Sequence, residues 1–176
     1  MICGNGGSAS DSDHITAELM KSFLIPRPLD SSEIDKFKQL YGAKGSDLAT
    51  KLEKTLPAIP LVNNTALITA IANDIDPSMI FAQQVYGYGK RGDTLIAIST
   101  SGNSENVINA VKVAKAIGIK TIILTGNNKG KLTKLSDIKI EVPSSETLII
   151  QEYHIAIYHA LCACVERTIF KPRSEI

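Results

Sequence analysis

The sequence predicts an α/β protein built on a parallel, doubly wound sheet. Short apolar runs such as residues 94–98 and 120–124 are typical of buried strands, and each leads through a small or hydroxyl-rich turn toward a helical pattern. Strands that alternate with helices form parallel sheets with right-handed crossovers, and such sheets bind ligands beyond the carboxyl ends of their strands. We expect three turns at that edge: residues 4–10, 99–104 and 125–128.

The remaining elements follow from the same patterns along the chain. Strands are expected at residues 1–3, 57–62, 94–98, 120–124 and 138–142. Helices are expected at residues 11–23, in two short pieces within 30–56 that break at 41–45, and at 63–72, 76–86, 107–117, 130–135 and 147–170. Because a two- or three-residue stub cannot carry a sheet position, we expect the natural chain to begin upstream of Met1.

The composition is that of one ordinary domain with a substantial core. The chain has 176 residues, 44% of them hydrophobic, and a net charge of +1, which excludes a disordered chain and gives no basic footprint for nucleic acid. Cys3, Cys162 and Cys164 show no CxxC spacing, so buried free thiols in a reducing compartment are expected. With no apolar run near about 20 residues and no secretory signal visible, we expect a cytoplasmic protein that binds no membrane.

The turn at residues 99–104 is the strongest functional feature. Ser99, Thr100, Ser101 and Ser104 place four hydroxyls between a strand and the first turn of a helix. Unpaired N–H groups and the helix dipole favour an anion there, typically a phosphate. The alternative is a capping turn without a ligand, in which Asn103 or Ser104 caps the helix.

The glycine-rich turn at residues 4–10 departs from the dinucleotide-binding fingerprint. Its spacing is G-x-G-G rather than G-x-G-x-x-G, and no acidic residue follows at the expected distance. We therefore expect only a turn where the backbone approaches a ligand closely, with Ser8 and Ser10 adding hydroxyls.

Two helices carry polar pairs of ambiguous meaning. His14 and Glu18 are four residues apart and share a helix face, where they can bind a metal, act as a base with its partner, or simply face solvent. Gln151 and His159, eight residues apart, lie nearly on one face of the last helix. Spacing alone does not choose His159 over His154, and a histidine on an apolar helix is more often a hydrogen-bonded core residue.

Four segments together carry a family resemblance: CGNGGSASDSDHITAEL (3–19), AISTSGNSENV (97–107), TGNNKGKL (125–132) and IQEYHIAIYH (150–159). The chain resembles the sugar-isomerase (SIS) domain family and, within it, the sedoheptulose 7-phosphate isomerases, also called phosphoheptose isomerases. The resemblance implies a single three-layer SIS domain over residues 1–176, with a five-stranded flavodoxin-like sheet and a helical excursion at about 30–56. It also implies that the first strand and an N-terminal helix of the family lie upstream of Met1, and that the protein is a homotetramer with shared active sites.

The resemblance assigns roles to residues of this sequence. It implies that Glu18 and His159 are catalytic and that His14, Glu18, Gln151 and His159 bind one zinc ion per subunit. The phosphate and sugar would be bound by Asn5, Gly6, Gly7, Ser8, Asn73, Asp74, Ser99, Thr100, Ser101, Ser104 and Gln151.

The implied reaction is the isomerisation of sedoheptulose 7-phosphate to D-glycero-D-manno-heptose 7-phosphate through an enediol, for lipopolysaccharide, capsule or S-layer glycans. Ile149 stands where many members of the family have an arginine, which bears on substrate identity more than on fold. The alternative is a non-catalytic SIS protein that binds a phosphosugar or acts as a tetrameric partner of the replication initiator. Neither reading involves direct binding to nucleic acid.

Overall fold

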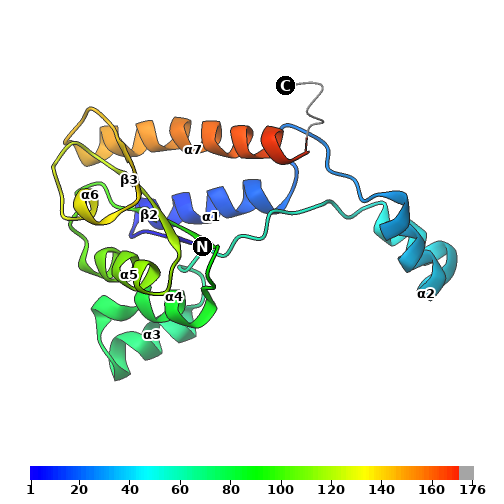
Figure 1. Ribbon diagram of the computed structural model, residues 1–176, viewed down its shortest axis with the longest axis horizontal. Coiled ribbons are helices and arrows are strands. Elements are labelled where there is room, and N and C mark those ends of the chain that lie inside the picture. Colours follow the sequence, from blue (N-terminus) through cyan, green and yellow to red (C-terminus); the bar gives the residue numbers. More distant parts are fainter. Residues whose placement is uncertain (171–176) are drawn as a thin grey trace. The chain divides into compact units, whose positions relative to one another are not determined.

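The computed structural model describes residues 1–170, which form two compact units (Figure 1). The first unit combines Met1–Thr16 with Ile59–Tyr158, and the second combines Ala17–Ala58 with the chain from His159 onward. Helices α1 (Gly7–Met20) and α7 (Thr147–Phe170) each begin in the first unit and end in the second.

The first unit contains a parallel sheet of four strands. In their order across the sheet, these are β1 (Ile2–Cys3), β2 (Thr94–Ile98), β3 (Lys120–Thr125) and β4 (Ile138–Glu141). One isoleucine from each strand aligns across the sheet, since Ile2 pairs with Ile96, Ile96 with Ile122, and Ile122 with Ile138. This register confirms the predicted α/β architecture and places the turns after β2 and β3 at one edge.

The strand predicted at residues 57–62 is wrong as a strand. Only Pro60 forms an isolated parallel bridge with Ile2, although the Ile2 N–H donates to the Ile59 carbonyl (2.9 Å) and the Leu61 N–H donates to the Ile2 carbonyl (2.8 Å). Pro57 and Pro60 lack N–H groups, so the segment cannot build a ladder. It nevertheless lies beside β1, which reproduces the strand order 2-1-3-4-5 of flavodoxin-like sheets.

Helices of the first unit pack mainly through α5 (Glu105–Ala116), whose buried Val107, Ala110 and Val111 join Leu95 and Ile123 of the sheet in one core. Figure 1 shows α3 (Thr65–Asp74) and α4 (Ala82–Tyr88) on the α5 side of the sheet. The helix predicted at 76–86 is instead a 3₁₀ turn, η1 (Pro77–Met79), followed by α4; a short helix, α6 (Leu132–Leu135), precedes β4.

The second unit contains α2 (Ser31–Ala49), which corresponds to the expected helical excursion. Gly42 adopts φ 63° and ψ −144°, so the helix is interrupted within the predicted break at 41–45. Asp30 and Glu33 form a reciprocal capping box at its start, and Lys54 lies 3.1 Å from the Asp30 carboxylate. The segment is therefore ordered by local capping and ion pairs.

Two expectations about composition need correction. Cys3 and Cys162 are buried, and burial raises the pKa of their thiols to about 12 and about 11, but Cys164 is exposed. α7 is also long and apolar enough to cross a membrane by length and composition, which the sequence pattern did not lead us to expect. One such helix is weak evidence for a membrane span, and α7 carries the predicted site residues Gln151 and His159.

Candidate active site

The turn between β2 and α5 forms a cradle of hydroxyl groups in the first unit. Ser99 is buried, and its Oγ lies 3.0 Å from Ser104 Oγ. Ser101 Oγ accepts a hydrogen bond from the Asn103 N–H at 3.2 Å, while the Asn103 amide donates to the Ser101 carbonyl at 3.0 Å. The turn is therefore fixed by its own side chains beside the start of a helix.

The capping alternative does not hold for this turn. Ser104 is the N-cap residue of α5, yet within residues 1–170 its side chain makes no capping hydrogen bond. The Asn103 side chain is directed elsewhere, because its oxygen accepts from the Lys131 N–H at 3.1 Å. Neither side chain accepts a hydrogen bond from the first turn of α5, although Asn106 Oδ1 accepts one from the Val107 N–H (3.0 Å). The anion site expected at this helix N-terminus stays a prediction.

The turn after β3 supports the cradle from its other side. The Gly126 N–H donates to the Thr100 carbonyl (3.1 Å), and the Leu132 N–H donates to the Gly102 carbonyl (3.1 Å). Gly102 has φ 67°, and a Cβ at Gly130 would lie only 2.6 Å from the Gly102 backbone. Both positions therefore require glycine for the two turns to approach each other.

The glycine-rich turn lies next to the same helix. Asn5 and Asn106 exchange two hydrogen bonds of 2.9 Å between their side-chain amides, which links this turn to the first turn of α5. Gly6 has φ 56°, and α1 begins at Gly7, four residues earlier than predicted. Ser8 is buried in the first turn of α1. Asn5 thus connects the glycine-rich turn to the helix that follows the cradle. A ligand-binding role for Asn5, Gly6, Gly7 and Ser8 stays a prediction.

Gln151 contacts Gly7 across two helices of the first unit. A Cβ on Gly7 would overlap the Gln151 amide nitrogen, so the absence of a side chain at Gly7 makes room for this amide. The close approach ties the start of α1 to the first turns of α7, and it brings Gln151 to the glycine-rich turn.

His14 is oriented by a buried tyrosine. The Tyr158 hydroxyl lies 2.9 Å from His14 Nδ1, and the two rings meet edge to face with centroids 5.3 Å apart. Burial raises the pKa of nearby Asp11, while the His14 charge and a hydrogen bond with Tyr158 oppose that change. A hydroxyl on one ring nitrogen is the kind of contact that fixes a functional or metal-binding histidine.

Glu18 and His159 belong to the second unit. The Glu18 side chain is largely buried, and its carboxylate lies 2.9 Å from Lys21 Nζ. The centroid of the His159 ring lies 5.6 Å from that of the Phe23 ring. His154, in contrast, is fully buried in the first unit; burial lowers its pKa, partly opposed by the Thr125 backbone. His154 is thus a core residue, which the helical spacing alone did not reveal.

Asn73 and Asp74 lie at the carboxyl end of α3, where the Asn73 amide donates to the Asp74 carboxylate at 2.8 Å. Both side chains are exposed. Their proposed role in binding the sugar stays a prediction.

Comparisons with known proteins agree with this geometry. The SIS domain family model matches residues 38–126. A phosphoheptose isomerase of Helicobacter pylori (strain P12) is 43% identical over 167 residues, which cover 95% of this chain and 73% of that protein. The chain belongs to the phosphoheptose isomerases of the SIS domain family. It is therefore related to phosphosugar isomerases, and is an enzyme of that class.

Further members of the phosphoheptose isomerase family give the same result. The protein of a Nitratiruptor species is 44% identical over 168 residues, covering 96% of this chain and 76% of that protein. The solved phosphoheptose isomerase of Neisseria gonorrhoeae superimposes with a TM-score of 0.73 at 36% identity, covering 94% of this chain and 74% of that one. These likenesses confirm the SIS fold over nearly the whole chain.

The zinc site implied by the family is a prediction. The expected donors divide between the units, with His14 and Gln151 in the first and Glu18 and His159 in the second. Among residues 1–170, no group of three or more His, Cys, Asp or Glu side chains is arranged to hold a metal. Two imidazoles and a carboxylate are nevertheless donors that zinc prefers, so the chemistry of the donor set fits.

Sequence reasoning missed three polar residues of this chain: Asn106, Arg27 and Glu166. Asn106 contacts Asn5, and Arg27 pairs with Glu166 inside the second unit. These partners lie more than 100 residues apart in the sequence, so helical or strand periodicity contains no signal of the contacts. For Asn106, the local clue was its place in the first turn of α5, three residues after Asn103 of the cradle.

Proposed function

We propose that this phosphosugar isomerase interconverts sedoheptulose 7-phosphate and D-glycero-D-manno-heptose 7-phosphate, and so provides heptose for lipopolysaccharide, capsule or S-layer glycans. The observation that carries the proposal is the 43% identity to a phosphoheptose isomerase over 95% of the chain. The cradle at Ser99–Ser104 supports a phosphate-bearing ligand, since its hydroxyls face one another beside a helix N-terminus instead of capping it. Fold alone would not distinguish isomerases from binding proteins.

In the proposed reaction, the cradle binds the phosphate and thereby fixes the position of the carbonyl end. The Glu18 carboxylate removes a proton from the carbon next to the ketose carbonyl, and the electron pair moves to give a cis-enediol. His159 donates a proton to the carbonyl oxygen as this happens. The proton on Glu18 then passes to the former carbonyl carbon, while the hydroxyl on the neighbouring carbon returns a proton to His159 and becomes the aldehyde of the aldose. Each positioned acid or base typically contributes about 10²–10⁴-fold, so orientation by the phosphate must supply much of the remainder.

As an alternative to the acid role of His159, we propose that it binds one zinc ion per subunit together with His14, Glu18 and Gln151. When bound, zinc would act as a Lewis acid toward the substrate oxygens. The orientation of His14 by the Tyr158 hydroxyl supports this role. Elemental analysis of protein purified without chelator should find about one zinc per subunit, and a His14→Ala variant should lose most of it. A wild type containing only a small fraction of one metal per subunit would contradict the zinc proposal.

A homotetramer in the cytoplasm, with active sites shared between subunits, completes the proposal. Apolar side chains exposed on α7 support a subunit contact along that helix: Leu148, Tyr153, Ile155, Val165 and Ile169. The proposed binding partners are the sugar phosphate and further copies of the chain, with neither nucleic acid nor membrane involved.

The function is tested by incubating the enzyme with sedoheptulose 7-phosphate and following the aldose by NMR. Turnover should fall at least about 100-fold in Glu18→Gln and His159→Ala, because each removes one acid–base group. Asp47→Asn is a matched control, since Asp47, near the end of α2, forms an exposed ion pair with Lys51 in the segment that follows the helix. Wild-type turnover no faster than that of the two site variants would overturn the isomerase proposal, and sugar-phosphate binding without turnover would favour the non-catalytic alternative.

A further inference from the structure

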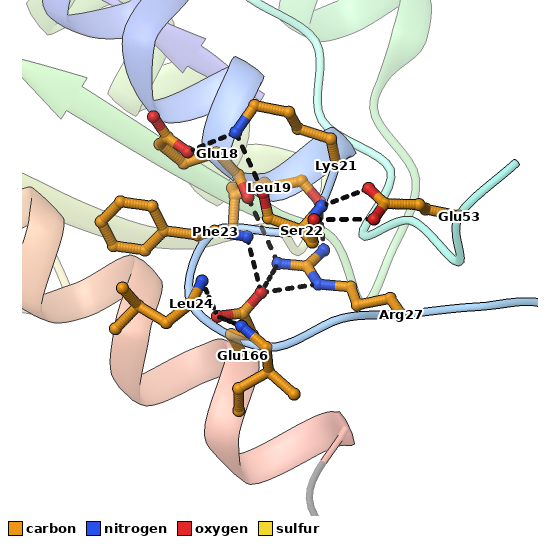
Figure 2. Close-up of polar contacts among 10 residues, drawn as sticks. Glu18, Leu19, Lys21, Ser22, Phe23, Leu24, Arg27, Glu53 and Glu166 are labelled. Carbon is orange, nitrogen blue, oxygen red and sulfur yellow. Dashed lines mark hydrogen bonds and ion pairs between the residues drawn. The ribbon is translucent and has the colours of Figure 1, made fainter. Parts of the chain in front are cut away.

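The geometry points to the buried Arg27–Glu166 ion pair (Figure 2) as a device that positions both proposed acid–base residues, Glu18 and His159. The inference rests on the proposed function for the roles of Glu18 and His159. Its contacts, however, all lie within the second unit and can be tested without turnover.

Both partners of the pair are fully buried. Arg27 donates to Glu166 Oε1 through Nε (2.8 Å), and its second terminal nitrogen lies 2.8 Å from the same oxygen. Three successive N–H groups, of Phe23, Leu24 and Ile25, also donate to the Glu166 carboxylate at 2.8, 2.7 and 3.1 Å. Burial raises the pKa of Glu166, but these donors and Arg27 outweigh burial and hold the pKa below its usual value. The carboxylate is therefore charged and fully paired.

One arm of the device reaches the end of α1. Arg27 donates to the Leu19 carbonyl at 2.8 Å and to the Glu18 carbonyl at 3.3 Å. The last carbonyls of a helix have no partners within the helix, and α1 has no basic residue in its own last turn. Arg27 supplies the missing donors and a favourable charge from the following loop. The backbone that carries Glu18 is thus held by Arg27.

The other arm reaches His159 through Phe23. Glu166 accepts from the Phe23 N–H, and the Phe23 ring lies 5.6 Å from the His159 ring at an angle of 36°. His159 and Glu166 are seven residues apart on α7, so they lie on one side of that helix. Figure 2 shows the loop bent around Glu166, with the Phe23 backbone nitrogen directed at its carboxylate. The loop therefore holds an aromatic ring against the imidazole.

Stability alone is a poor explanation for such a pair. Well-packed apolar residues of similar volume often stabilise a fold as well as a buried ion pair does. What apolar residues cannot do is fix three successive N–H groups and two helix carbonyls at the same time. The directional bonds of Arg27 and Glu166 set the geometry of the loop, and misplacement of a catalytic group by about 1 Å can reduce a rate about 100-fold.

The test uses Arg27→Lys, which keeps the charge but loses the planar fork, and Glu166→Gln, which keeps the shape but loses the charge. We expect kcat for sedoheptulose 7-phosphate to fall about 10- to 100-fold with KM changed less than about threefold, because the cradle is untouched. The profile of kcat against pH should also change shape. A smaller folded fraction would instead lower kcat by the same factor at every pH and leave the shape unchanged. Lys51→Ala, which breaks an exposed ion pair of the same unit, is the control and should behave as wild type.

A second readout does not depend on activity. The chain has three histidines, so the His159 ring resonances can be assigned by comparison with His159→Ala. The chemical shifts of the His159 ring should change in Arg27→Lys, in Glu166→Gln and in Phe23→Leu. Because Phe23 is only half-buried, Phe23→Leu tests the inference even if the two ion-pair variants do not fold. Folded variants with unchanged His159 resonances and a pH profile of unchanged shape overturn the inference. If the His159 resonances change in the variants but the wild-type protein shows no turnover, the result supports the positioning of His159 by the ion pair and overturns only the proposed function.

Discussion

Gly7 leaves room for the Gln151 amide, and substitution of this glycine by alanine tests whether the contact matters for activity. A Cβ in Gly7→Ala would overlap the amide nitrogen, which must move away. Because that nitrogen ends a flexible side chain, the fold should survive, with a melting temperature within about 4 °C of wild type. We expect kcat/KM for sedoheptulose 7-phosphate to fall about tenfold, as measured by NMR turnover.

The control for this change is Gly87→Ala. Gly87 lies within α4, and a Cβ there meets nothing within 4 Å, so alanine should stabilise the helix slightly by up to about 1 kcal/mol. Its turnover should match wild type. If Gly7→Ala turned over substrate as fast as Gly87→Ala, Gln151 would have no part in the site.

Individual site residues were predictable where the clue was local. The hydroxyls of Ser99 and Ser104 follow a buried strand, and the structure brings them to 3.0 Å. The choice between His154 and His159 was not predictable from spacing, because burial of His154 depends on how the first half of α7 packs within the first unit. Arg27 was equally hidden, since its partner follows 139 residues later.

Among the structural elements, the contact between the turns after β2 and β3 shapes the cradle that we propose to bind phosphate. Gly130→Ala would place a Cβ 2.6 Å from the Gly102 backbone, and neither backbone can move without displacing the 99–104 turn. We therefore expect affinity for the sugar phosphate to fall at least about tenfold, measured by titration calorimetry, with a clear loss of thermal stability. Gly87→Ala again serves as the control, and unchanged affinity in Gly130→Ala would mean that the turn does not bind the phosphate.

Contacts of Asp137 at the start of β3 should make the stability of the fold depend on pH. Asp137 accepts from the Thr121 N–H (2.8 Å) and hydroxyl (2.9 Å) and pairs with Lys115, and these contacts lower its pKa to about 2. The unfolded chain takes up this proton near pH 4, so the stabilisation is present above pH 4 and is lost as the pH falls from about 4 to about 2. Asp137→Asn should lower the free energy of unfolding at pH 7.

The measurement is urea unfolding of wild type and Asp137→Asn between pH 7 and pH 2. The difference between the two free energies of unfolding should shrink as the pH falls, because the protonated Asp137 resembles asparagine. Acidic groups elsewhere titrate in both proteins and cancel in the comparison. A difference that stayed constant down to pH 2 would contradict the low pKa.

Elements with a strong local pattern were predicted well, and the failures have physical causes. β2 and α7 have the predicted bounds, and the break in α2 falls at Gly42 as expected. The segment at 57–62 is apolar enough for a strand, but its two prolines remove ladder donors. α1 begins at Gly7 although glycine has a poor helix propensity, and the N–H groups of Ser8 and Ala9 donate to the Asn5 and Gly6 carbonyls at this start.

On the scale of the whole molecule, the proposed chemistry divides between the two units. The cradle and the glycine-rich turn belong to the first unit, whereas Glu18, His159 and the Arg27–Glu166 ion pair belong to the second. α1 and α7 are the continuous helices that carry site residues in both. If the proposed roles hold, the first unit binds the phosphate and the second holds the acid–base groups, so binding and turnover should be separable by mutation.

The proposed homotetramer is the prediction that belongs to the whole molecule. Ile155 is 44% exposed on α7 among several exposed apolar side chains, and burying such a surface between subunits would be favourable. Light scattering after size exclusion should give about four times the 18.9 kDa mass of one chain. Ile155→Glu should shift the mass toward monomer and reduce turnover, because the active sites are proposed to be shared. Glu152→Gln, at an exposed position of the same helix, should leave both unchanged; a wild-type monomer with full activity would exclude shared sites.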